Sequence, residues 1–118
     1  MSIGDTRLSV VFFKASSGAE PVRKWLKSLP DTHKKAIGED IKTVQFGWPL
    51  GMPLVEKLEP YLWEVRTKIP DGIARVLFTV DGHVMILLHG FIKKTRKIPQ
   101  KEIETARYRL RQYQEDGL

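Results

Sequence analysis

The chain has 118 residues, of which 42% are hydrophobic and 29% charged, and its formal net charge is +6. This size and balance predict one globular domain over residues 1–118 and exclude a disordered chain. The absence of cysteine excludes a disulfide scaffold, a thiolate zinc site and a cysteine nucleophile. The apolar run at residues 84–88 is far shorter than the ~20 residues that span a bilayer. We therefore expect a cytoplasmic protein without a membrane partner.

The first half of the chain predicts one strand and two helices. Residues 8–13 are β-branched and aromatic, as in a strand. Residues 21–29 carry an apolar stripe at helical spacing, and Pro21 suits the first turn of that helix. A second helix is expected over residues 31–47, with Asp31 as its N-cap. Because almost no loop separates the two helices, we expect an antiparallel helical hairpin.

The second half of the chain predicts a meander of three strands and a last helix. The strands are expected at residues 62–68, 73–80 and 83–91, which turn residues separate. Polar and apolar residues alternate along the first, and apolar residues line one face of the second. Residues 99–113 predict a helix that Pro99 opens. The predicted order is β-α-α-β-β-β-α. This order indicates an α+β fold with a mainly antiparallel, twisted sheet.

Alternation along these strands predicts which side chains share a face. A tight turn at Asp71-Gly72 would place Lys68 opposite Arg75. Arg66 would then project from the same exposed face, whereas His89 would lie on the core face. Like charges opposite each other destabilise a sheet, so such a pair needs a solvated edge or an anion. If Arg75 is exposed, its replacement by alanine should cost little stability.

Positive charge is concentrated near the C-terminus. Residues 93–111 contain eight basic residues and two acidic ones. The net charge of this stretch therefore equals the net charge of the whole chain, +6. A basic patch confined to one segment is typical of proteins that bind a polyanion such as RNA, or an acidic protein.

Several stretches of the second half resemble one known family. They are residues 62–66 (LWEVR), 74–78 (ARVLF) and 87–95 (LLHGFIKKT), followed by Pro99 and by the Glu-Ile pair at 102–103. In this order and spacing they are similar to the phage-derived, HigB-like branch of the RelE/ParE toxin superfamily. The resemblance extends over nearly the whole chain. It implies a microbial-ribonuclease-like (RelE-like) domain that is the toxin of a toxin–antitoxin pair.

The resemblance further implies an endoribonuclease that cleaves mRNA on the ribosome without a metal or other cofactor. Such an enzyme removes a proton from the 2′-OH, stabilises the charge on the phosphate and protonates the leaving oxygen. The resemblance assigns the second task to Arg75, and Arg66 matches a further basic strand position. A guanidinium suits this task because it is planar and permanently charged. The candidates for acid and base are Lys57, Glu64 and His89, although His89 also fits a core position.

The resemblance also implies partners. Contacts with RNA or the ribosome are expected at five basic residues: Lys68, Lys93, Lys94, Arg96 and Lys97. The expected partners are the ribosome with its mRNA and a cognate antitoxin, a small helix-turn-helix protein. Two other functions stay open: a non-catalytic toxin that binds DNA gyrase, and an inactive phage-derived module that binds RNA or protein. The three histidines show no metal-binding spacing, so we expect no metal site.

Overall fold

One mixed sheet organises the fold, which the computed structural model describes for residues 7–95 and 97–116. In chain order the elements are β1 (Ser9–Phe12), α1 (Pro21–Lys27), α2 (Asp31–Gly47), β2 (Val55–Glu59), β3 (Leu62–Ile69), β4 (Gly72–Asp81), β5 (Val84–Lys93) and α3 (Gln100–Glu115). The strand order across the sheet is β1-β5-β4-β3-β2. β1 runs parallel to β5, and the other neighbours are antiparallel. The predicted α+β class is therefore confirmed.

Strand β2 was not expected, so the predicted element order is wrong by one strand. The turn between β2 and β3 is Pro60-Tyr61, where Tyr61 has a φ of +67°. This left-handed position favours glycine or asparagine, and the absence of both hid the hairpin from sequence patterns. An irregularity in register between Lys57 and Glu59 also interrupts the alternation of side chains along β2.

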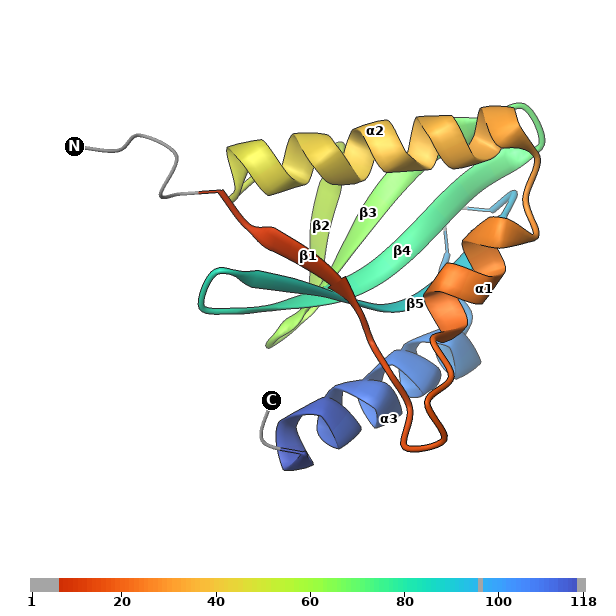
Figure 1. Cartoon of the computed structure of the whole chain (residues 1–118). Helices are drawn as coiled ribbons and strands as arrows, with labels where there is room; N and C mark the ends of the chain where they lie inside the picture. The colour runs from red at the N-terminus through yellow and green to blue at the C-terminus, as the bar shows by residue number, and fades with distance from the viewer. Residues whose placement is uncertain (1–6, 96, 117–118) are drawn as a thin grey trace.

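Helices α1 and α2 cover one face of the sheet, and α3 covers the other (Figure 1). α1 packs mainly on β5 whereas α2 packs on β3, so the two helices diverge and do not form the expected antiparallel hairpin. Gly90 permits this close approach of α1, because a Cβ atom there would overlap the ring of Trp25. Asp31 is the first residue of α2 rather than its N-cap, a position held by Pro30. No helix in the described ranges is long and apolar enough to cross a membrane.

Each face of the sheet has its own hydrophobic core. The core beneath α1 and α2 includes Val22, Ile37, Ile41, Val44, Val65, Val76 and Phe78. The core beneath α3 comprises Phe13, Leu62, Leu77, Ile86, Leu88, Phe91, Ala106 and Leu110. The second core matters for function because it covers the face that the sequence pattern predicted to be exposed.

A bulge in β5 determines on which face His89 lies. Leu77 pairs with His89, but the next residue of β4, Phe78, pairs with Leu87, so Leu88 is an extra residue. Residues opposite each other share a face, so His89 lies beneath α3 with Leu77. The prediction that His89 shares the core face of Ala74 is therefore wrong. One inserted residue reverses the alternation of the strand, and sequence patterns gave no sign of it.

Candidate functional site

Strands β3 and β4 place two arginines directly opposite each other. The turn between the strands is Pro70-Asp71, one residue earlier than expected, so Arg66 pairs with Arg75 and Lys68 pairs with Ile73. The register therefore differs from the predicted one by two residues. A shift of two residues preserves the face of every side chain, so Arg66, Lys68 and Arg75 still share one face.

Arg75 is buried, contrary to the prediction of an exposed side chain. Its exposed fraction is 1%, and that of its partner Glu64 is 0%. The Nη1 atom of Arg75 donates to Glu64 Oε2 at 3.0 Å, and Nη2 donates to the carbonyl of Thr95 at 2.7 Å. The prediction was wrong because the alternation of a strand separates two faces but does not show that α3 and the segment after β5 cover one of them.

Glu64 lies between the two arginines. Its Oε2 accepts the hydrogen bond from Arg75, whereas its buried Oε1 accepts none from the described residues and lies 3.7 Å from Arg66 Nε. Burial raises the pKa of Glu64, and the hydrogen bond and charge of Arg75 oppose that rise. Glu64 is thus the anion that allows two opposed arginines to coexist in the sheet.

Arg66 is the partly exposed member of this cluster. Its side chain is 18% exposed, and its Nη1 lies 3.6 Å from Glu56 Oε1 on β2. Both carboxylate contacts of Arg66 exceed hydrogen-bond length, and its guanidinium makes no hydrogen bond to any other described residue. Its N–H donors therefore remain available to an incoming anion. Glu56 was not predicted, because only the β2 hairpin places it opposite Glu64.

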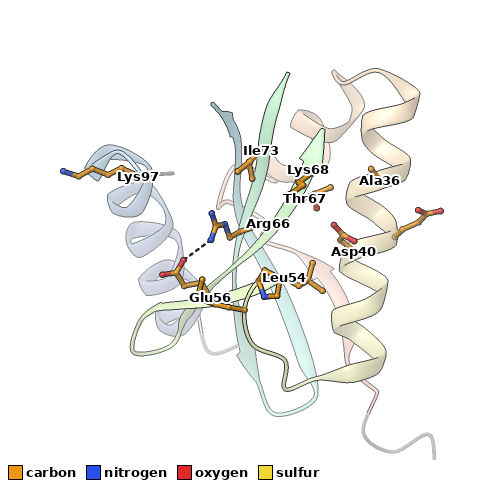
Figure 2. Close-up of a pocket in the computed structure, with 12 residues that line it drawn as sticks. Ala36, Asp40, Leu54, Glu56, Arg66, Thr67, Lys68, Ile73 and Lys97 are labelled. Carbon is orange, nitrogen blue, oxygen red and sulfur yellow. Dashed lines mark ion pairs between the residues drawn. The ribbon is translucent and has the colours of Figure 1, made fainter. Parts of the chain in front are cut away.

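A groove of about 1010 Å³ opens beside Arg66 (Figure 2). It is lined by Ala36, Glu39, Asp40, Met52, Pro53, Leu54, Glu56, Arg66, Thr67, Lys68, Ile73 and Lys97. Three of the residues singled out from the sequence, Arg66, Lys68 and Lys97, thus line the groove, and the Lys97 side chain extends away from Arg66 (Figure 2). The charges of Arg66 and Arg75 are balanced by Glu56 and Glu64. Lys68 and Lys97 carry as much charge as Glu39 and Asp40, which line the α2 side of the groove, so the lining is balanced overall and its positive charge lies on the β3 side.

Other residues predicted for the site lie elsewhere. Lys57 lies on the opposite face of the sheet, where its Nζ is 5.7 Å from the centre of the Trp63 ring. Lys93 ends β5 opposite Ile73, and Lys94 follows it as an exposed residue. Arg96 lies outside the described residues. Within residues 7–95 and 97–116, no three histidine, aspartate or glutamate side chains gather to hold a metal ion.

His89 contacts α3 instead of lining the groove. Its Nε2 lies 2.6 Å from Glu102 Oε1, and its Nδ1 lies 3.2 Å from Arg109 Nη1. Because a guanidinium only donates, Nδ1 is the acceptor and Nε2 carries the proton that is donated to Glu102. Both ring nitrogens are therefore engaged, and His89 joins β5 to α3. Burial lowers the pKa of Arg109 in the same cluster.

One known protein family matches most of the chain. The model of the family described as phage-derived protein Gp49-like (DUF891) matches residues 24–111. None of the curated proteins matches the sequence. The family match covers well over half of the chain and includes the strands that carry Glu56, Glu64, Arg66 and Arg75. The chain belongs to the Gp49-like phage-derived protein family, a RelE/ParE-like toxin family.

Proposed function

We propose that the protein is a HigB-like toxin with a microbial-ribonuclease-like fold that cleaves mRNA on the ribosome and is neutralised by a cognate antitoxin. Its membership of the Gp49-like family supports the toxin role. The observation that carries the catalytic part is the guanidinium of Arg66. It lies between Glu56 and Glu64 without a hydrogen bond to the described residues, on the border of a groove that Lys68 also lines.

The proposed reaction uses the 2′-OH of the RNA as the nucleophile. Glu56 accepts the proton of this hydroxyl, whose oxygen attacks the adjacent phosphorus. A 2′,3′-cyclic phosphate forms as the bond from phosphorus to the 5′ oxygen breaks, and solvent water protonates that oxygen. Arg66 stabilises the negative charge that develops on the phosphate oxygens. Arg75 is a positioning residue here, because it holds Glu64, which in turn lies against Arg66.

Basic residues that could contact the RNA backbone also lie beyond the groove. Lys93 pairs with Ile73, a residue that lines the groove, and exposed Lys94 follows. Together with Lys68 they supply contacts that are independent of the cleaved bond. Such contacts add affinity through release of counterions from the phosphates, so binding to ribosomal RNA and mRNA should weaken as salt rises.

The decisive experiment compares Arg66→Ala and Arg66→Lys with the parent in a cell-free translation reaction, with primer extension on the translated mRNA. Arg66→Ala should reduce the cleavage rate about 10²–10³-fold, as the loss of one transition-state donor does. Arg66→Lys should recover little activity, because an ammonium cannot bind phosphate in a bidentate manner. Lys24→Ala, which removes an exposed charge from α1, is the matched control. Cleavage by Arg66→Ala at the parental rate would refute the assignment.

A non-catalytic toxin that binds DNA gyrase is the second candidate. One observation favours it: no histidine or tyrosine occurs among the described residues that line the groove. Pulse labelling after expression without an antitoxin separates the two candidates. A fall in protein synthesis before DNA synthesis is expected for the ribonuclease. The reverse order would select the gyrase-binding function.

A further inference from the structure

The second half of β3 forms an edge of the sheet without a partner strand among the described residues. β2 pairs with the first half of β3, and the Arg66 N–H donates to the carbonyl of Leu54. Upstream of that bond the chain turns away, because the Val55 N–H bonds the carbonyl of Gly51. Residues 67–69, which we term the β3 edge, therefore have no partner strand on their outer side within the described residues, and Thr67 and Lys68 line the groove.

Alternation along β3 fixes which backbone groups face the open side. The Arg66 N–H points toward β2, so the N–H and C=O of Lys68, two residues later, point in the same direction. Those of Thr67 point toward β4. Lys68 thus offers one donor and one acceptor with the spacing that a hydrogen-bonded pair of antiparallel residues requires.

The side chains beside the β3 edge differ in charge on its two sides. Arg66 and Lys68 lie on one face of the strand, and both line the groove. On the other side, Asp40 extends from α2 toward Thr67 (Figure 2). A strand added to this edge would send alternate side chains to these two sides. The cationic side selects carboxylates, and the side of Asp40 and Thr67 selects small hydrogen-bond donors.

We propose that the β3 edge binds an extended segment of a partner protein, antiparallel to β3, in which acidic residues alternate with small hydroxyl residues. The acidic residues face Arg66 and Lys68, and the hydroxyl residues face Asp40 and Thr67. Main-chain hydrogen bonds with Lys68 fix the register of this segment. The proposal concerns binding alone, so it stands or fails independently of the proposed RNA cleavage.

The test uses the full chain and a short capped peptide in which glutamate and threonine alternate. The peptide residue opposite Lys68 lies on the same face as Lys68, so it is a glutamate, and its backbone N–H points toward β3. The glutamates therefore carry the N–H donors that bond β3. N-methylation of every glutamate removes these donors, whereas N-methylation of every threonine removes donors that face solvent. Binding is followed by titration through the amide NMR signals of residues 67–69. The peptide methylated at its glutamates should bind at least about tenfold more weakly than the parent peptide. The peptide methylated at its threonines should bind as the parent peptide does.

Variants of the chain and alternative ligands complete the test. Lys68→Glu should weaken binding of the parent peptide about tenfold or more, whereas Lys42→Glu, a charge-matched change on α2, should not. Equal binding of the two methylated peptides would overturn the proposal, because charge alone would then explain the affinity. Single-stranded RNA that shifts these amides when the peptide does not would also overturn it. So would a dimer that Lys68→Glu dissociates, since a second copy would then occupy the edge.

Discussion

Two Glu–Arg pairs join different elements of the fold, and their surroundings differ sharply. Glu64 and Arg75 lie inside the protein, 0% and 1% exposed, and share one hydrogen bond of 3.0 Å. Glu59 and Arg107 lie at the surface between β2 and α3, 27% and 40% exposed, and share three hydrogen bonds of 2.7, 2.9 and 3.0 Å. The exposed pair, Glu59 and Arg107, thus has more hydrogen bonds than the buried pair, although water could replace those bonds.

The pKa values of the two carboxyl groups shift in opposite directions. At Glu64, burial is the largest influence and raises the pKa. At Glu59, the hydrogen bonds from Arg107 are the largest influence and lower the pKa. Burial therefore determines how much stability is lost when a pair is broken, because a charge left alone in the interior cannot recover its hydration. We expect the pair with fewer hydrogen bonds to have the larger effect on stability.

The largest effect is expected from breaking the buried pair. Arg75→Ala removes the hydrogen-bonding partner of the buried Glu64 carboxylate, which keeps the 3.7 Å contact with Arg66, and should lower the free energy of unfolding by about 3–5 kcal/mol. This replaces the sequence-based expectation of a small effect. Urea denaturation followed by circular dichroism measures the loss. A loss below about 1 kcal/mol would show that water reaches the pair and would contradict the comparison.

Removing both charges of the buried pair should restore most of the lost stability. Glu64→Leu combined with Arg75→Met deletes the charges together, and such replacements are often neutral or stabilising. A double-mutant cycle of unfolding free energies gives the coupling between the two residues. The restored protein should still fail to cleave mRNA, since Arg66 has lost Glu64 beside it. Full activity in the double variant would remove Glu64 and Arg75 from any positioning role.

The dependence of stability on pH should have opposite signs for the two glutamates. The folded pKa of Glu64 lies above its ordinary value of 4.5, so the folded state holds the proton more tightly. Relative to Glu64→Gln, the unfolding free energy of the parent should fall as pH rises from 4.5 through the folded pKa. The folded pKa of Glu59 lies below 4.5. Above pH 4.5 the parent should have a larger unfolding free energy than Glu59→Gln. This difference should be lost as the pH falls through the folded pKa of Glu59.

Urea denaturation of the parent and both glutamine variants over a series of pH values measures these two trends. Each glutamine variant keeps the shape of the side chain and removes its titration. Curves of the same sign for Glu59 and Glu64 would show that both carboxyl groups are in similar surroundings.

The smallest effect is expected from the exposed pair. Arg107→Gln should lower the melting temperature by a small fraction of the Arg75→Ala shift, because water replaces the lost hydrogen bonds. This difference should disappear in concentrated salt, which screens exposed charges. Arg111→Gln, an exposed change on the same helix, is the control for the loss of charge. A large shift that persists in salt would mean that Arg107 anchors α3 through packing.

The sequence by itself determined the α+β class, the main strands and the shared face of three basic residues. Strands β3, β4 and β5 were predictable because turn residues separate runs rich in apolar and β-branched side chains. Arg66, Lys68 and Arg75 fell on one face because a strand has a period of two residues, and a register error of two leaves the faces unchanged. Local patterns of this kind depend only on neighbouring residues.

Only the tertiary structure decided what covers each face and which residues meet in the groove. Arg75 is buried because α3, more than twenty residues away, packs on its face of the sheet. A single extra residue in β5 moved His89 beneath the same helix. Glu56 reached Arg66 through a hairpin whose turn lacks glycine and asparagine. The period of a strand divides its side chains between two faces, but long-range packing determines which of those faces meets water.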